Sequence, residues 1–156
     1  MQEKKIGMIK EELKAAEEAM LPSFIQMYEA DERAGVKKLV AQAKSRMEKL
    51  AAEHERIKAL RKYEKEYEAY GTICGIDEVG RGPLAGPVVA GAVILPKDCE
   101  ILYINDSKKL SAAKREELYE TIMERAAAVG IGVVCPERID EINILQATYE
   151  AMREAI

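Results

Sequence analysis

The sequence predicts an α/β segment preceded by an all-helical extension, and two observations support this division. Over residues 1–70, apolar side chains recur every three or four positions, which is the spacing of helices that pack through one face. From Gly71 onward, short runs rich in valine, isoleucine and glycine alternate with stretches of helical periodicity. We therefore expect a helical extension at 1–70 and an α/β domain segment at 71–156.

Composition limits the possible classes of protein. The 156 residues are 48% hydrophobic and 33% charged, with no tryptophan and one phenylalanine, so the core must be aliphatic. The net charge of −4 gives no support to a generally basic nucleic-acid binder. Residues 1–70 hold 15 Lys/Arg and 14 Asp/Glu, whereas residues 71–156 hold 9 and 14. A nucleic-acid ligand of the second segment would therefore need metal ions or well-placed cations.

The cysteines and the N-terminus indicate a cytoplasmic location. The three cysteines are widely spaced and form no C-x-x-C pair, which argues against a zinc site and fits a reducing compartment. The first residues are too charged for a signal peptide, and no apolar run approaches membrane-spanning length.

Two helices are expected in the extension. The first has one apolar face, and Pro22 is predicted to end it before a short turn through Phe24 and Tyr28. Asp31 is predicted to cap a second, long helix, whose apolar face continues into Leu60, Tyr63 and Tyr67. The first face consists of Ile6, Ile9, Leu13, Ala16 and Met20. The seam of the second consists of Val36, Val40, Ala43, Met47, Leu50, His54 and Ile57.

The role of this extension has two interpretations. It can be an arm for self-association or docking. It can also be a nucleic-acid clamp, because its long helix carries Lys37, Lys38, Lys44, Arg46 and Lys49. Glutamates interleave with these cations, as on any solvated face. His54, the only histidine, is interpreted as a seam residue and not as a metal ligand or general base.

Three strands and two helices are expected after Gly71. Strands are predicted at 72–79 and 86–95, joined as a hairpin, and the second is expected to be buried on both faces through Val88, Val89, Val93 and Ile94. A loop with a possible short strand follows at 97–110. Ser111 is predicted to cap a helix that reaches about Val129, and 130–136 reads as the third strand.

The final helix is predicted to begin at an Asn143 cap and to have Leu145, Tyr149 and Met152 on its inner face. Nothing in its sequence closes it, and three apolar strands leave open sheet edges. We therefore expect more chain to belong to this fold.

An acidic pair stands out within the first predicted strand. Asp77 and Glu78 lie in an apolar run, where carboxylates cost free energy unless something binds them. Paired carboxylates near a strand end suit Mg²⁺ or Mn²⁺, although an outward-facing Asp followed by a turn Glu is the simpler interpretation. Neighbouring strand residues face opposite ways, so one shared site requires the strand to end or bulge here.

Two further segments indicate contacts with phosphate or ribose. Gly80, Arg81 and Gly82 let backbone approach a ligand closely, and a ribose 2′-hydroxyl is a plausible one. The turn lacks the G-K-[ST] ending of a P-loop, which argues against a nucleotide triphosphatase. Asn105, Ser107 and Lys108 precede a helix start, so they form either a phosphate seat or an ordinary capped turn.

Taken together, the segments resemble ribonuclease HII, the type 2 ribonuclease H. The matching blocks are "GIDEVGRGPLAGPVVAGAVIL" at 75–95, "NDSKKLSAAKREELYETI" at 105–122 and "IDEINILQATYEAM" at 139–152. Residues 1–70 resemble, more loosely, the N-terminal extension of some members. The resemblance implies a ribonuclease H-like α/β fold with a mixed sheet and helices, here the N-terminal part of the catalytic domain and incomplete at its C-terminus.

The resemblance also implies an activity. Members cut the RNA strand of RNA–DNA hybrids and nick 5′ to ribonucleotides embedded in duplex DNA, using a divalent metal, Mn²⁺ or Mg²⁺. By motif, Asp77 and Glu78 are catalytic metal ligands. Gly80, Arg81 and Gly82 sense the 2′-hydroxyl, and Asn105, Ser107 and Lys108 contact substrate phosphates.

The chain departs from the family pattern in one respect. The family's metal site uses four acidic residues, two of which come from further along the chain than Ile156. The sequence therefore reads as the N-terminal part of a ribonuclease HII, and we expect the 156-residue polypeptide to be inactive alone. The alternative is a non-catalytic remnant that binds nucleic acid or protein.

Overall fold

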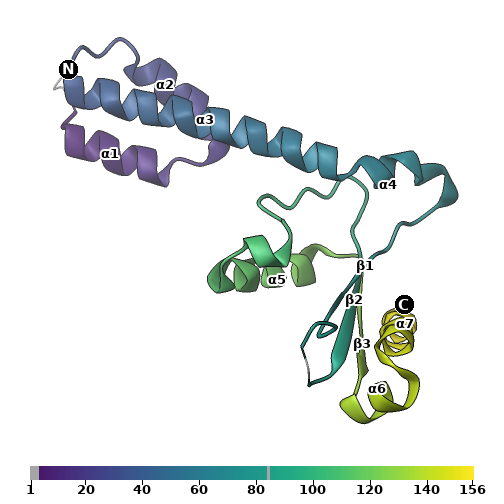
Figure 1. Cartoon of the computed structure of the whole chain (residues 1–156). Coiled ribbons are helices and arrows are strands. Elements are labelled where there is room, and N and C mark those ends of the chain that lie inside the picture. Colours follow the sequence, from purple (N-terminus) through teal and green to yellow (C-terminus); the bar gives the residue numbers. More distant parts are fainter. Residues whose placement is uncertain (1–3, 84) are drawn as a thin grey trace. The chain divides into compact units, whose positions relative to one another are not determined.

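The computed structural model describes residues 4–83 and 85–156 and divides into two compact units. The first unit ends at Ala59, and the second runs from Leu60 to Ile156 (Figure 1). The first is helical, and the second combines a small sheet with helices, so the α/β class with a preceding helical segment is confirmed.

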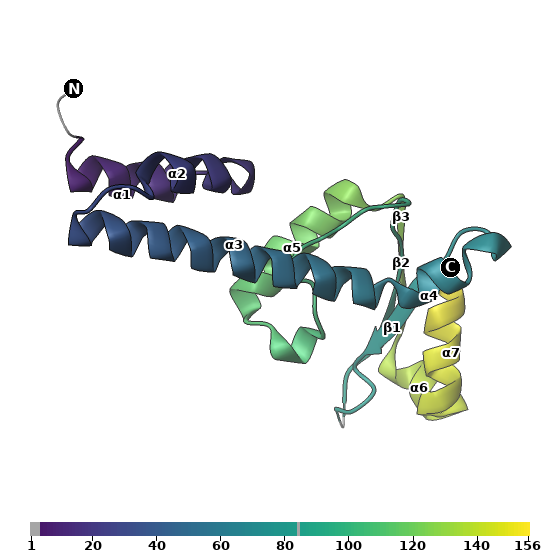
Figure 2. The ribbon, with the colours of Figure 1, turned by 90° about the horizontal axis from the view of Figure 1, so that it is seen from above.

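The first unit packs α1 (Ile6–Ala15) and α2 (Leu21–Tyr28) along the first half of α3 (Ala34–Leu60) (Figures 1 and 2). A short 3-10 turn, Glu18–Met20, leads into α2. One apolar cluster fills this bundle, as burial of helix stripes against each other requires. Its buried members are Ile9, Leu13, Ala16, Leu21, Phe24, Tyr28, Val36, Leu39, Val40 and Ala43.

Three expectations for the first unit are wrong. Pro22 lies in the first turn of α2, where its missing N–H costs nothing, and Phe24 and Tyr28 are buried residues of that helix and not of a turn. Met20 is 58% exposed because α1 has already ended. Asp31 does not cap α3, since its carboxylate accepts hydrogen bonds from the backbone N–H and guanidinium of Arg33.

The seam of α3 is confirmed along most of its length. Val36, Val40 and Ala43 are buried, and Met47 and Leu50 pack against the same cluster. The expected continuation is wrong: α3 ends at Leu60, and Leu60, Tyr63 and Tyr67 are exposed. Tyr63 belongs to the short α4 (Lys62–Glu66), Tyr67 follows its end, and a 3-10 turn at Glu68–Tyr70 comes next.

The sheet of the second unit has the order β1-β2-β3 and is antiparallel throughout. Its strands are β1 (Gly75–Val79), β2 (Val88–Ile94) and β3 (Ala128–Val134), which confirms the expected hairpin. Of the four β2 residues expected to be buried on both faces, only Val88 is fully buried. Val89 and Val93 lie on the face opposite α7, and Ile94 lies at the end of the strand. The possible strand at 97–110 is a loop with a 3-10 turn, Ser107–Lys109.

Side-chain caps define the helices around β3. Ser111 caps α5 (Ala112–Arg125), as predicted, with its hydroxyl 3.2 Å from Lys114 N. α5 ends before the expected Val129, because Ala127 N–H already donates to Ile94 O at the start of β3. After α6 (Pro136–Ile142), the carboxamide of Asn143 accepts from Leu145 N and Gln146 N, which confirms the predicted cap of α7 (Ile144–Ala155).

The predicted inner face of α7 is wrong. Leu145 and Tyr149 are 41% and 46% exposed, whereas the buried residues are Ala147, Thr148, Ala151 and Ala155. Small side chains are needed because the helix lies against glycines of β3. A Cβ at Gly132 would come 2.0 Å from Ala151 O, and one at Gly130 would come 1.9 Å from Ala155 O.

Candidate functional site

Asp77 and Glu78 lie in the middle of β1, which is an outer strand of the sheet. The Asp77 side chain is exposed, and its Oδ1 accepts a hydrogen bond of 2.9 Å from the Glu78 N–H. Its cross-strand partner is Gly91, which has no side chain. The carboxylate of Asp77 is therefore open to a ligand from above the sheet.

The two carboxylates leave the strand on opposite faces. The ladder continues regularly through Asp77–Gly91, Glu78–Ala90 and Val79–Val89, so the bulge that one shared face would require is not present. Glu78 lies on the face that carries the buried Ala90 and α7. Both carboxylates nevertheless belong to β1, which is an outer strand of the described sheet.

The turn after β1 brings a guanidinium to this site. Arg81 NH1 lies 3.5 Å from Glu78 Oε1, which links the glycine turn to the acidic pair. Gly80 has φ 90°, and a Cβ there would meet Pro87 O at 2.2 Å, so the turn requires glycine. Space around Gly82 is open, as contact of its backbone with a ligand requires. Leu84, part of the same sequence block, lies outside the described residues.

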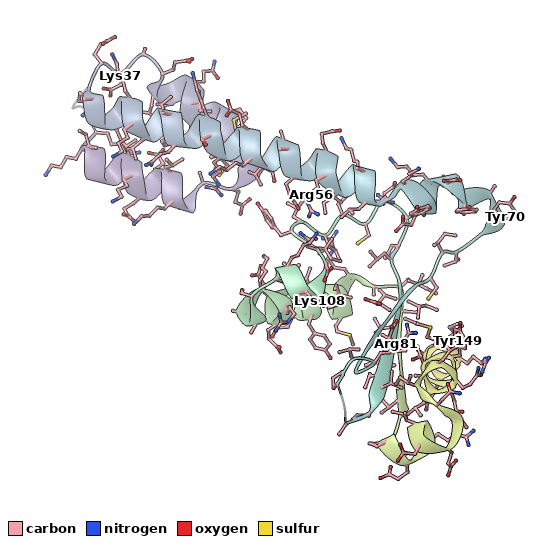
Figure 3. All side chains as sticks on the ribbon, viewed as in Figure 1. Lys37, Arg56, Tyr70, Arg81, Lys108 and Tyr149 are labelled. Carbon is pink, nitrogen blue, oxygen red and sulfur yellow. The ribbon has the colours of Figure 1, made fainter. Side chains whose placement is uncertain are left out.

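Asn105, Ser107 and Lys108 are exposed on the segment before α5. Asp106 organises this segment, because its Oδ1 accepts from Lys108 N at 2.9 Å. Figure 3 labels Lys108 here and Arg81 at the β1–β2 connection, on two different segments. Among the described residues, no side chain forms a hydrogen bond or ion pair with the Lys108 ammonium.

Sequence reasoning missed the contribution of Arg115. Its NH1 donates to Ser107 O at 3.2 Å and to Leu110 O at 2.8 Å, which fixes the segment against the first turn of α5. The only feature of the sequence that pointed to a role for Arg115 was its position four residues after the Ser111 cap. Arg115 is thus a positioning residue for the candidate phosphate seat.

The remaining candidate ligands do not converge. Within residues 4–83 and 85–156, no three His, Cys, Asp or Glu side chains form a group suited to a metal ion. His54 is partly exposed, with Nε2 3.0 Å from Glu18 Oε1, so it faces one carboxylate. Of the extension's cations, Lys37 and Lys44 pair with Glu32 and Glu29, and Arg46 donates to Leu13 O.

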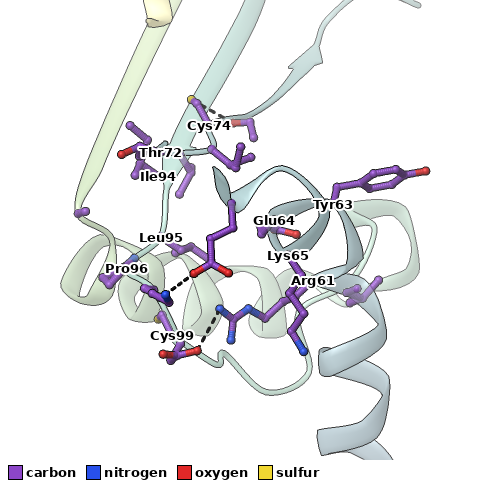
Figure 4. Close-up of a pocket in the computed structure, with 18 of the residues that line it drawn as sticks. Arg61, Tyr63, Glu64, Lys65, Thr72, Cys74, Ile94, Leu95, Pro96 and Cys99 are labelled. Atoms are coloured by element: carbon purple, nitrogen blue, oxygen red, sulfur yellow. Dashed lines mark hydrogen bonds and ion pairs between the residues drawn. The ribbon is translucent and has the colours of Figure 1, made fainter. Parts of the chain in front are cut away.

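A cavity of about 970 Å³ lies within the second unit, at the start of β1 (Figure 4). Its lining comes from segments at 60–75 and 93–99, with Ile104, Ile122 and Ala127. Lys97–Glu68 and Arg61–Asp98 ion pairs connect the two segments. Neither Asp77 nor Glu78 lines it, and no sequence motif had pointed to it.

None of the helices in the described part of the chain has both the length and the apolar character of a membrane-crossing segment. The three-stranded antiparallel sheet with its packed helices, which follows a helical segment, is consistent with a fold of the ribonuclease H-like α/β class. Comparison with known proteins narrows this class.

The sequence pattern described as Ribonuclease HII matches residues 74–156, and the Ribonuclease HII N-terminal domain matches residues 5–68. The chain belongs to the ribonuclease HII family. It is 61% identical over 152 residues to a ribonuclease HII of Lachnoclostridium phytofermentans, covering 97% of this chain and 60% of that protein. It is 47% identical over 158 residues to one of Clostridioides difficile, covering 100% and 62%. The chain thus spans about three fifths of the length of these relatives.

Proposed function

We propose that this protein provides the first catalytic carboxylates and the substrate turn of a ribonuclease HII. The activity is endonucleolytic: it hydrolyses the RNA strand of RNA–DNA hybrids and nicks 5′ to ribonucleotides embedded in duplex DNA, as in ribonucleotide excision. The observation that carries the proposal is the acidic pair on an outer strand, with Gly91 opposite Asp77 and Arg81 beside Glu78.

Asp77 and Glu78 are the proposed ligands of a divalent cation, Mg²⁺ or Mn²⁺. Carboxylate oxygens are the donors that these hard cations prefer, and both residues lie on β1, an outer strand of the described sheet. When bound, the metal supplies Lewis-acid activation of water and stabilisation of the leaving oxygen. Asp77 and Glu78 then offset the positive charge and hold the cation at the strand edge.

The substrate contacts come from two segments. The backbone of Gly80 and Gly82 is proposed to approach the ribose 2′-hydroxyl, with Arg81 supplying charge to a neighbouring phosphate. Asn105, Ser107 and Lys108 are proposed to hold further phosphates, since all three are exposed beside the start of α5. Arg81 and Lys108 supply local positive charge within a segment that is acidic as a whole.

We further propose a domain boundary near 70/71, with the helical extension at 1–70 and the catalytic segment at 71–156. The family matches, 5–68 and 74–156, support it, although close packing assigns the residues from Leu60 onward to the second unit. The extension is proposed to mediate self-association or substrate contact. The location is proposed to be the cytoplasm.

One observation favours a second candidate function. Among the described residues, no group of three or more His, Cys, Asp or Glu side chains is arranged to hold a metal ion, and a two-metal mechanism needs more ligands than Asp77 and Glu78. The 156-residue chain by itself is therefore expected to be inactive, and it can instead act as a non-catalytic module that binds nucleic acid or protein.

A nicking assay tests the proposal on a DNA duplex with one embedded ribonucleotide, in Mg²⁺ or Mn²⁺. We compare the chain alone with a fusion that appends the part of the L. phytofermentans relative outside the match. The fusion should nick 5′ to the ribonucleotide, whereas the chain alone and the Asp77→Asn fusion should remain at background. Nicking by the chain alone would show that two carboxylates suffice. An inactive fusion, beside an active full-length relative, would favour the binding module.

A further inference from the structure

Tyr103 adopts a backbone conformation that its residue type disfavours. Its φ is 67°, in the left-handed region, where a Cβ crowds the backbone. Two other non-glycine residues of the described chain have positive φ, Asp98 and Asn143, and short polar side chains of these types tolerate it. An aromatic side chain does not, and glycine at this position would remove the strain. Strained residues of this kind concentrate at sites that contact a ligand.

The strain at Tyr103 is not offset by burial of its side chain. Tyr103 is 46% exposed, and Lys114 Nζ lies 5.0 Å from the centroid of its ring. A cation–π contact at an exposed position contributes little to the stability of a fold. Nearly half of the residue's surface is therefore accessible to another molecule.

Two consecutive residues of α5 hold segment 103–110 against the helix. Lys114 lies over the Tyr103 ring, and its ammonium is itself 2.6 Å from Glu117 Oε1. Arg115 holds the later half of the segment through hydrogen bonds to two backbone carbonyls. The Tyr103 ring is thus oriented before any ligand binds, which lowers the entropy cost of a contact.

The surroundings of the ring are basic, although residues 71–156 are acidic as a whole. Between Asp106 and Glu116, the sequence has four cationic side chains and no acidic one: Lys108, Lys109, Lys114 and Arg115. An exposed aromatic ring beside such a strip favours a nucleic acid over a protein partner, because the cations match phosphates. The bases of a paired duplex are stacked on one another, so the apolar surface that its backbone offers to a ring is that of the sugars.

We propose that Tyr103 contacts the substrate, with its ring packed against a sugar of the nucleic-acid strand whose phosphates are held by Asn105, Ser107 and Lys108. Lys114 positions the ring. The contact adds affinity for the duplex without adding a charge. This inference rests on the proposed function, because it takes the phosphate seat at 105–108 as its starting point.

The test measures fluorescence anisotropy of a labelled RNA–DNA hybrid with the fusion to the remainder of the L. phytofermentans relative, carrying Asp77→Asn so that the hybrid is not cut. Tyr103→Gly should weaken binding by about fivefold or more. Tyr103→Phe keeps the ring and should bind within about twofold of the parent. Tyr149→Ala removes a ring of the same 46% exposure from α7, on a different element (Figure 3), and should also bind within about twofold.

Two further measurements separate a substrate contact from a structural role. The slope of log affinity against log salt concentration should not change in Tyr103→Gly, because no phosphate contact is lost, whereas Lys108→Gln should reduce it by about one. Thermal melts followed by circular dichroism should show that Tyr103→Gly does not unfold at a lower temperature than the parent, because glycine relieves the positive φ.

Several results would overturn the inference. These are no hybrid binding by the fusion, unchanged binding by Tyr103→Gly, weaker binding together with a lower melting temperature, or Tyr103→Phe binding as weakly as Tyr103→Gly. The nicking assay judges the proposed function separately. A fusion with Asp77 intact that nicks, but whose binding ignores Tyr103, keeps the function and removes this contact. Binding that depends on Tyr103 in a fusion that does not nick has the opposite meaning.

Discussion

Two glycines set the distance between α7 and the sheet. At Gly130 and Gly132, the carbonyls of Ala155 and Ala151 occupy the space where a Cβ would project. The alanines on the facing side of the helix complete this contact, because larger side chains would hold the helix away. The close packing of α7 on the sheet therefore depends on the absence of side chains at Gly130 and Gly132 and not on large apolar side chains.

Gly132→Ala should destabilise the second unit by about 2 kcal/mol or more, because the new Cβ must displace backbone and not a flexible side chain. Chemical denaturation of the full chain, followed by circular dichroism, measures the change. Gly91→Ala is the matched control on β2, where nothing lies within 4 Å of the added atom. It should change the free energy of unfolding by less than about 0.5 kcal/mol. Equal effects would contradict the close packing of α7.

At the scale of elements, polar contacts link α1 to α2 and order the connection that leads into α3. Tyr28 OH donates to Glu12 Oε2 at 2.7 Å, and Lys4 Nζ reaches the same oxygen. The Lys4 and Tyr28 hydrogen bonds hold the pKa of Glu12 below its usual 4.5. Arg33 likewise lowers the pKa of Asp31 below 3.8. Glu12 joins α1 to α2, whereas Asp31 bonds within the connection between α2 and α3.

This unit should lose stability in acid. Because folding lowers these pKa values, the unfolded chain binds protons first, so the stabilisation is present above about pH 4.5 and is lost as the pH falls through the folded-state values. The melting temperature should fall by on the order of a few degrees from this source, given the partial exposure of the groups. Glu12→Gln should flatten the acid limb in thermal melts between pH 7 and pH 3. If Glu12→Gln loses melting temperature in acid as steeply as the unmodified chain does, other groups cause the acid sensitivity.

Local signals predicted much of the element order, and tertiary contacts decided the rest. Ser111 and Asn143 were identifiable because a cap is a contact within four residues. The inner face of α7 was misjudged, since hydrophobic size favoured Leu145 and Tyr149, whereas glycines some twenty residues earlier select the alanine face. Local sequence does not distinguish proline in the first turn of a helix from proline at a helix break, so the position of Pro22 in α2 depends on packing.

The candidate site was predictable as a motif but not as geometry. The sequence placed Asp77 and Glu78 before a glycine turn, and the Arg81–Glu78 contact follows from that adjacency. The role of Gly91 depends on strand register, and the role of Arg115 depends on how the 105–110 segment folds back onto α5. Neither is encoded by neighbouring residues.

At the scale of the whole molecule, the chain consists of two units with separate cores. Phe24→Ala should cost about 3–5 kcal/mol in the first unit, because the side chain is 5% exposed and its ring lies 4.9 Å from that of Tyr28. Native-state hydrogen exchange should show lost protection in α1–α3 and unchanged protection in β2 and α7. Met27→Ala on the same helix, 66% exposed, is the control. Loss of protection in β2 would show that the units unfold together.

The unequal edges of the sheet limit how far association can proceed. On β3, the Val133 N–H is bonded to Glu154 of α7, whereas on β1 the Glu78 N–H is bonded to the adjacent Asp77 side chain. Growth of a fibre by strand addition needs both edges of a sheet to accept a strand. The Glu154 carboxylate at β3 therefore opposes such growth.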